Sequence, residues 1–355
     1  MLPNKNLTIT LFISISIALL FFYFGTPAQW NLKTDRFKTQ KSPSEIEKPE
    51  YQVTNLVSKK FDPSGKLHST LYAEKLDFFN STRLSKLYHP KFDLFTNAAT
   101  NETNITHWFI SSLEANSISP NDLVTLTGNI EVKKGANGSR AELDIFSESM
   151  LLDLTTNTIT SDEAVTIVSE GNKIEGKQFA AELDRNYLQL KTNVKSRYQR
   201  STPSQQNPSA ADSDIIYISS QRFILDELEH RATYEGSVKL KQAQVTIDAD
   251  KIVLIKRGAE QLVYAYGNPA YFKQKSKQEK DIDAQALRFE YNSLDKKVKM
   301  YEQARLKQGQ AIFEGAYIFY DTQTESVGAE SKADTRVKMV LPSKTSTLEI
   351  QKTPE

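Results

Sequence analysis

The chain has 355 residues, and its 45 lysines and arginines nearly balance its 44 aspartates and glutamates. That balance leaves no basic surplus of the kind that binds nucleic acid. There is no cysteine, which excludes disulfide bonds, thiolate metal sites and cysteine nucleophiles. A chain of this length usually forms more than one domain, so we expect two.

The first predicted element is a hydrophobic helix. Residues 7–24 (LTITLFISISIALLFFYF) contain no charge, proline or glycine. A helix of that length spans ~27 Å, close to the ~30 Å hydrocarbon core of a bilayer. The run also exceeds the apolar segment of a cleaved signal peptide, so we predict an uncleaved transmembrane anchor at residues 1–24. Cations concentrate after the helix, and charge alone would place the long C-terminal part inside the cell.

A polar linker is predicted at residues 25–50, and an all-β region follows it. From residue 51 to 342, short alternating segments are bounded by Gly, Asn, Asp and Pro, which is typical of strands and turns. The best helical candidate, residues 223–230, is short and precedes a strand-like segment.

Alternation predicts which side chains share a face of each strand. In LRFEY, Leu287, Phe289 and Tyr291 fall on one face, and Arg288 and Glu290 fall on the other.

Turn and strand units recur along this β region. They begin at Gly128, near Asp162, at Gly236 and Gly267, and near Glu302, with nearly constant spacing within each half. Such units stack antiparallel strands into a long roll, each covering its neighbour's apolar face. The polar segment 200–213 (RSTPSQQNPSAADS) interrupts the spacing. We therefore predict rolls at 51–199 and 214–342, a domain linker at 200–213 and a disordered tail at 343–355.

The sequence offers no convincing catalytic or metal-binding motif. GNKIEGKQ at 171–178 resembles a phosphate-binding loop, but Gln178 stands where Ser or Thr would bind magnesium, and we interpret Gly171-Asn172 as a hairpin turn. The four histidines are scattered. Carboxylates two apart on a strand, at 248 and 250 and at 281 and 283, share a solvated face. We predict that the protein is not an enzyme and has no catalytic residue, metal site or cofactor.

Two long segments resemble components of the lipopolysaccharide export machine. The anchor followed by YQVTNLVSKKFDPSGKLHSTLYAEKLDFF, LYHPKFDLF and HWFISSLEANSISPNDLVTLTGNIEV resembles LptC, its membrane-anchored periplasmic component. Beyond the linker, DIIYISSQRFILDELEHRATYEGSVKLKQAQVTIDADKIVLI, AYGNPAYFKQ and RVKMVLPSK resemble LptA, its soluble bridge. The chain therefore resembles a fusion of the two, without a second signal peptide.

The resemblance implies fold, location and partners. It implies a V-shaped antiparallel β-jellyroll in each half, open at its ends, with the N-terminus inside the cell and both rolls in the periplasm of a Gram-negative bacterium. This overrides the orientation drawn from charge. The chain would accept lipopolysaccharide from the inner-membrane extractor of LptB, LptF and LptG, with LptF at its N-terminal edge. LptD or further LptA-like rolls would meet its C-terminal edge. The alternative is a membrane-anchored structural or polysaccharide-binding β-repeat protein of the envelope.

The same resemblance, with strand alternation, indicates which residues line a lipid groove. Ordinary core positions are the alternative for each of them, since most inward strand residues are core. Lysines and arginines near the rims could pair with lipid phosphates. We also predict that residues 214–219 pair with the strand around residues 191–198. The predicted groove residues are Leu87, Tyr198, Ile216, Ile218, Phe272, Leu287, Phe289 and Tyr291.

Overall fold

The computed structural model describes residues 48–97, 105–118, 122–135, 143–199, 215–258, 260–275, 281–330 and 337–340. The predicted anchor, the linker at 200–213 and the tail at 343–355 lie outside this part of the chain, as does nearly all of the linker at 25–50. Within the described residues, no helix is long and apolar enough to cross a membrane. These residues form strands and a single 3-10 turn, η1 (Leu183–Arg185), so the all-β prediction is confirmed.

The strands of the two halves follow one another along the chain. The first half contains β1 (Tyr51–Phe61), β2 (Leu67–Phe79), β3 (Leu84–Tyr88), β4 (Lys91–Asn97), β5 (Ile105–Ser111), β6 (Glu114–Ile118), β7 (Leu123–Lys134), β8 (Leu143–Asp153), β9 (Thr158–Ser169), β10 (Asn172–Glu182) and β11 (Tyr187–Gln199). The second contains β12 (Ile215–Ser220), β13 (Arg222–Asp226), β14 (Arg231–Gln242), β15 (Val245–Arg257), β16 (Glu260–Gln274), β17 (Ile282–Asn292), β18 (Lys297–Gln308), β19 (Ala311–Asp321), β20 (Ser326–Glu330) and β21 (Lys338–Val340).

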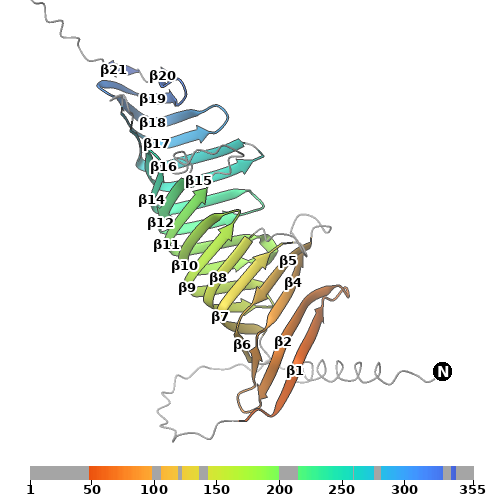
Figure 1. The fold of residues 1–355 in the computed structure, drawn as a ribbon. Coiled ribbons are helices and arrows are strands. Elements are labelled where there is room, and N and C mark those ends of the chain that lie inside the picture. Colours follow the sequence, from red (N-terminus) through yellow and green to blue (C-terminus); the bar gives the residue numbers. More distant parts are fainter. Residues whose placement is uncertain are drawn as a thin grey trace, which may run out of the picture.

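All these strands belong to one antiparallel 21-stranded sheet that runs along the length of the molecule (Figure 1). Most neighbours in sequence are neighbours in the sheet, as short hairpin connections require. At some positions two short strands together fill the place of one long strand. For example, β14 pairs with both β12 and β13, and β7 pairs with both β5 and β6.

The long strands from β7 onward are creased near their middles. The pairing register shifts between Thr127 and Ile130 in β7 and between Glu235 and Val238 in β14, and similar shifts recur from β8 to β18. At two creases a glycine takes positive φ, 76° at Gly128 and 82° at Gly236, a conformation that glycine adopts without steric cost.

Serine hydroxyls satisfy backbone carbonyls that the bend takes out of the regular ladder. Ser112, Ser147 and Ser220 each donate to the carbonyl two residues later, at 2.9, 3.3 and 2.8 Å. Because buried carbonyls are costly to leave unpaired, these hydroxyls stabilise the bend.

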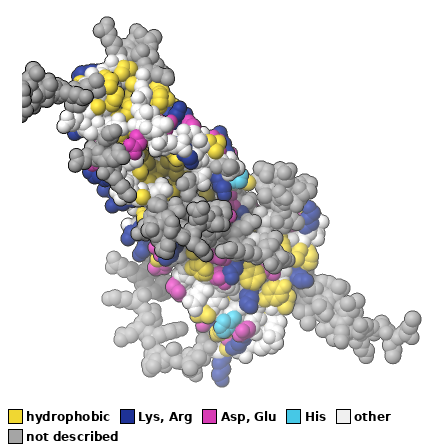
Figure 2. Space-filling view, turned by 45° about the horizontal axis from the view of Figure 1, so that its top comes forward, with side chains coloured by type: hydrophobic (Ala, Val, Ile, Leu, Met, Phe, Trp, Pro, Cys, Tyr) yellow, Lys and Arg dark blue, Asp and Glu magenta, His cyan; other side chains and the backbone are white. Residues whose placement is uncertain are grey.

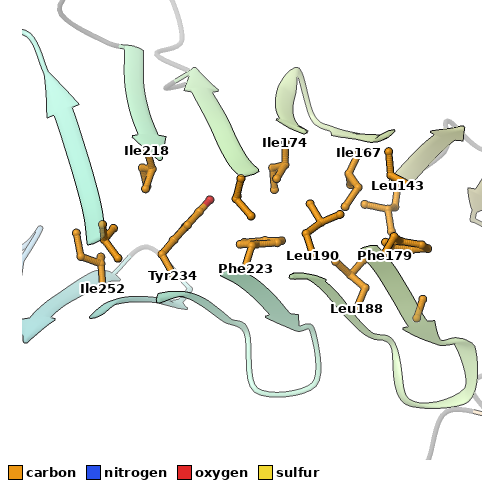
Figure 3. Packing of buried hydrophobic residues seen from close by; sticks show 14 of the residues in the cluster. Leu143, Ile167, Ile174, Phe179, Leu188, Leu190, Ile218, Phe223, Tyr234 and Ile252 are labelled. Carbon is orange, nitrogen blue, oxygen red and sulfur yellow. The ribbon is translucent and has the colours of Figure 1, made fainter. Parts of the chain in front are cut away.

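The crease divides each of these long strands into two halves, which we call arms. Arm A contains the halves that end at the turns 170–171, 243–244 and 309–310; arm B contains those that end at the turns 154–157, 183–186, 227–230 and 322–325. Figure 3 shows the two arms facing each other, with Ile174 and Ile218 on arm A above Leu190, Phe223 and Tyr234 on arm B. One hydrophobic cluster continues between the arms through both halves of the molecule.

The two halves join through backbone pairing. β11 pairs with β12, from Val194 opposite Ser220 to Gln199 opposite Ile215, and then with β13. This confirms the predicted pairing for residues 215–219, while residue 214 lies outside the described part. The sheet therefore passes from the first roll to the second without a break in its hydrogen bonding.

The loop-like motif GNKIEGKQ forms a turn and a strand, as interpreted from the sequence. The turn lies one residue earlier than predicted, because Glu170 and Gly171 carry the positive φ values of 50° and 82°. Asn172 already begins β10. The segment 223–230, the best helical candidate, contributes β13 and the turn after it.

Candidate functional site

The inner faces of the two rolls differ in how completely they are covered. In the first roll most inward apolar residues are fully buried, among them Leu94, Ile110 and Leu126. In the second roll the inward face combines small buried alanines with larger apolar residues that stay partly exposed while packing against the core. The alanines are Ala249, Ala265, Ala270, Ala284, Ala286 and Ala304, and the partly exposed residues include Ile216, Val245, Ile247, Leu254, Val263, Tyr291 and Phe313.

These partly exposed residues define the candidate groove, an apolar surface between the arms of the second roll. Val245 and Ile247 lie on arm A close to the turn 243–244, and Leu254 and Val263 lie on arm B, near the end of β15 and the start of β16. In the space-filling view, apolar side chains are visible along the middle of the upper half of the molecule (Figure 2).

Five of the six predicted groove residues of the second half face the interior between the arms, where Ile218, Phe272 and Phe289 are part of the buried core. Phe272 and Phe289 are 5% and 4% exposed, and their rings lie 6.3 Å apart, one on each arm. Ile218 is buried, while Ile216 and Tyr291 are partly exposed against the same core. The structure therefore places these five side chains together on the inner face.

Leu287 is an exception. The alternation breaks at the β17 crease, where the register shifts between Gln285 and Arg288. Ala284 and Ala286 are buried before the crease and Phe289 after it, whereas Leu287 is half-buried and belongs neither to the core cluster nor to the residues packed against it. The expectation that Leu287 shares a face with Phe289 and Tyr291 is wrong, because simple alternation does not continue through a bulge. Arg288 does point outward, over the ring of Tyr301 at 4.2 Å.

Leu87, one of the two predicted groove residues of the first roll, is a tightly packed core residue. It is 3% exposed and lies between Leu76 and Ala115 on the neighbouring strands.

Contacts between the two arms close the first roll along the side opposite the crease. On β5 of arm A, the Trp108 indole Nε1 donates to the carbonyl oxygen of Leu183, in η1 at the end of arm B, at 3.2 Å. Trp108 is 2% exposed and Leu183 1%. An ion pair joins Lys134, at the end of β7, to Glu227 in the turn after β13. Lys134 and Glu227 also link the first roll to the second.

A second cross-arm contact lies near the other end of the molecule. The Gln308 side-chain amide, at the end of β18, donates to the carbonyl oxygen of Glu325 at 3.0 Å. The candidate groove lies between this contact and the Lys134–Glu227 ion pair.

A hydrogen-bonded cluster of hydroxyls lies inside the junction. The Tyr198 and Tyr234 hydroxyls are 2.5 Å apart, and Tyr234 donates to the Ser196 hydroxyl at 2.8 Å. Burial raises the pKa of Tyr198 to about 12, although its hydrogen bonds to Tyr234 and Ser196 act in the opposite direction. Burial likewise raises the pKa of Tyr234 well above 10. Tyr198 therefore lies on the inner face, as predicted, with its hydroxyl held by the second roll.

The sheet ends in strands with exposed apolar side chains. β1 pairs with β2 on one side, and Tyr51, Val57 and Phe61 are exposed along it. At the other end β20 and β21 share the edge of β19, with Met339 and Val340 exposed. Strand ends of this kind can accept another chain edge to edge.

The sequence analysis missed Trp108, Leu183 and the Lys134–Glu227 pair. Their partners are more than 70 residues apart in the chain, at the ends of different arms, and no local pattern indicates such contacts. Within the described residues, no group of three or more His, Asp or Glu side chains could hold a metal ion.

Comparison with known protein families divides the chain at the same junction. Residues 11–199 match the family model LptC, described as lipopolysaccharide-assembly, LptC-related. Residues 217–326 match the model LptD_N, described as LptA/(LptD N-terminal domain) LPS transport protein.

Individual relatives resemble the second half. The lipopolysaccharide export system protein LptH of Pseudomonas aeruginosa is 31% identical over 121 residues, covering 33% of this chain and 69% of that protein. LptA of Escherichia coli K12 is 30% identical over 129 residues, covering 36% of this chain and 70% of that protein. A crystal structure of P. aeruginosa LptH, 26% identical, covers 36% of this chain and 95% of the LptH chain, with a TM-score of 0.35.

The LptC-related model alone spans more than half of the chain, and the relatives of the second half are lipopolysaccharide export system proteins. The chain is therefore a member of the LptC-related lipopolysaccharide-assembly family that continues, on the same sheet, into a domain of the LptA/LptD N-terminal family of lipopolysaccharide transport proteins.

Proposed function

We propose that this chain takes lipopolysaccharide from the inner-membrane extractor and carries its acyl chains between the arms towards the outer membrane. Lipopolysaccharide transport across the periplasm is the function of both families to which its halves belong. They are transport families, and this favours transport over the alternative of a structural or polysaccharide-binding envelope protein.

The energetic need for a groove follows from the substrate. Each acyl methylene exposed to water costs ~0.8 kcal/mol, so several unshielded acyl chains would cost tens of kcal/mol. An apolar surface that continues along the path replaces water at every step. The single observation that carries the proposal is the partly exposed inner face of the second roll, which continues into the core of the first through the β11–β12 pairing.

The location of the chain and the partner proteins at its two ends are also part of the proposal. Residues 1–24 would anchor the chain in the inner membrane, with the rolls in the periplasm. The exposed β1 edge would meet LptF of the extractor, which also contains LptB and LptG, by addition of a strand. The β20–β21 end would meet LptD or a further LptA-like roll. In the first roll, lipid would enter only after the contacts of Trp108 and Lys134 across the arms open.

Photo-crosslinking tests the groove with a matched control on one strand. Phe272 and Tyr271 are neighbouring aromatic residues of β16, but Phe272 points between the arms while Tyr271 is 40% exposed on the outer face. A photoreactive amino acid at 272 in cells making lipopolysaccharide should give a lipid adduct, and one at 271 should not. Adducts at neither position, with the protein folded and present, would contradict transport through this groove. Equal adducts at both would place the lipid elsewhere on the roll.

A further inference from the structure

Lysines and arginines gather on the outer face of arm A from β10 to β18. Cross-strand pairing arranges them in two rows. The row nearer the turns runs through Lys173, Arg197, Tyr217, Lys241, Thr246, Lys273, Asp283 and Lys307, and the second row runs through Glu175, Lys195, Ser219, Lys239, Asp248, Tyr271, Gln285 and Arg305. We call the eight cations of these rows the basic strip. In Figure 2, dark blue side chains lie along one margin of the upper half.

The strip is most concentrated where the two rolls join. Lys173 and Arg197 face each other directly across β10 and β11, and such like-charged pairs destabilise a sheet when nothing compensates them. Lys173 pairs with Glu175 at 2.5 Å and Lys239 with Asp248 at 3.7 Å.

The other three cations at the junction are Lys195, Arg197 and Lys241. Among the described residues, no carboxylate lies within ion-pair distance of Lys195, Arg197 or Lys241. Tyr217, 51% exposed, lies between Arg197 and Lys241 in the same row. The junction therefore presents an excess of positive charge in a chain whose net charge is only +1.

Strands β7 to β9 of the first roll lack this feature. On β7 to β9 the same two rows carry Lys133, paired with Glu131 at 2.8 Å, and the side chains of Asp144, Phe146, Thr166 and Val168. With one lysine and two carboxylates, Glu131 and Asp144, these positions carry no positive excess. The excess begins at β10 and continues in the direction of the C-terminal end.

The strip lies directly behind the candidate groove. Ile218 follows Tyr217, Tyr198 follows Arg197, and Leu240 lies between Lys239 and Lys241, so inward apolar residues alternate with outward cations on the same strand segments. The row nearer the turns lies within three residues of the strand ends, at the rim of arm A. Long Lys and Arg side chains at a rim can reach around it while their apolar stems stay on the sheet.

We infer that Lys195, Arg197 and Lys241 bind the phosphate groups of the lipid headgroup while its acyl chains lie between the arms. This rests on the proposed function and adds to it the residues that hold the headgroup. A lipid with its tails against Ile218 and Leu240 must leave its polar headgroup outside the groove, beside the rim. Phosphate matches the strip because lysine and arginine bind it through charge-assisted hydrogen bonds. Lys273 and Lys307 continue the row nearer the turns further along, whereas Arg305 pairs with Glu314 at 3.1 Å.

Equilibrium binding to two lipids tests the inference. The full chain is titrated with lipid A carrying its phosphates and with the same lipid A after phosphate removal, each in micelles of a neutral detergent. The expected preference of the unmodified protein for the phosphorylated lipid is about tenfold at low salt, and it should shrink as salt screens the charges. The variant Lys195→Gln/Arg197→Gln/Lys241→Gln should lose that preference and keep the affinity for the dephosphorylated lipid.

A control variant removes the same charge elsewhere. Lys191, Lys256 and Arg257 are exposed and lie outside the strip, and their replacement by Gln should leave the tenfold preference intact. If the junction variant keeps the preference, the inference is wrong, while binding of the dephosphorylated lipid still supports the groove. If the unmodified protein binds neither lipid, the proposed function fails and the inference with it.

Discussion

The two rolls have the same backbone arrangement but differ in how their inward side chains pack. Both have creased strands, an interrupted strand position, and a crease glycine opposite the interruption: Gly128 faces Leu113 in the first roll and Gly236 faces Gln221 in the second. Yet the first roll is closed by Trp108 and Leu183, whereas the second keeps partly exposed apolar residues between alanines. The backbone thus sets the roll, and side-chain size with a few cross-arm contacts sets whether its interior is open.

Truncating one inward aromatic residue in each roll should sharpen this comparison most. Trp108→Ala removes a buried side chain and should lower the free energy of unfolding by about 3–5 kcal/mol. Tyr291→Ala removes a partly exposed one, so its cost should be about 1–2 kcal/mol, while lipid binding falls. Denaturant unfolding and lipid titration check both variants. Equal stability losses would mean that the second roll is as tightly packed as the first.

Substitution of a crease glycine should cause the next largest loss of stability. A Cβ on Gly236 would lie 2.9 Å from the Gln221 Cβ, whereas one on Gly171, which has the same φ of 82°, would meet nothing within 4 Å. Gly236→Ala should therefore cost about 2–4 kcal/mol, and Gly171→Ala about 1 kcal/mol, the strain of positive φ alone. Thermal or urea unfolding measures the difference. Equal costs would show that the crease relaxes to admit a methyl group.

High pH should weaken the junction between the rolls. The pKa of Tyr198 is about 12 when folded and about 10 when unfolded, so its contribution to stability is complete below pH 10. Between pH 10 and 12 the unfolded state releases the proton that the folded state keeps, and about 2 kcal/mol is lost. Urea unfolding from pH 9 to 12 should show a shallower decline for Tyr198→Phe than for the unmodified protein. Parallel declines would place the titrating hydroxyl elsewhere.

The smallest expected effect concerns the contact that closes the first roll against the second. Lys134 and Glu227 are 11% and 27% exposed, so solvent screens the pair partly. Glu227→Gln should cost about 1 kcal/mol in a double-mutant cycle with Lys134→Gln. It should also speed amide hydrogen exchange in residues 183–186 more than at the β11–β12 pairing. Uniform exchange changes would argue against a local closure.

The sequence predicted what depends on local pattern. Alternation and turn residues predicted the strands, because both depend on contacts between neighbouring segments. The pairing at the junction was predicted from the family resemblance. Phe272 and Phe289 were placed inward on both grounds.

Features that depend on long-range contacts or on bulges could not be predicted from the sequence. Leu287 was misplaced because a crease interrupts alternation, and only the pairing register locates that crease. Trp108 looked like an ordinary aromatic residue, since its partner Leu183 is distant in the chain. The basic strip could not be predicted from the sequence for a related reason. Its cations are spread along several strands and come together only when the strands pair in register.

The continuous pairing of β11 with β12 also fixes how much of the route one gene product spans. Separate bridge subunits would make the length of the route depend on their supply and on how many happen to join. Here each chain brings one roll of each kind, in a ratio that expression levels cannot alter. Every strand position adds about 4.8 Å, so the number of strands in the sequence sets the length of the sheet.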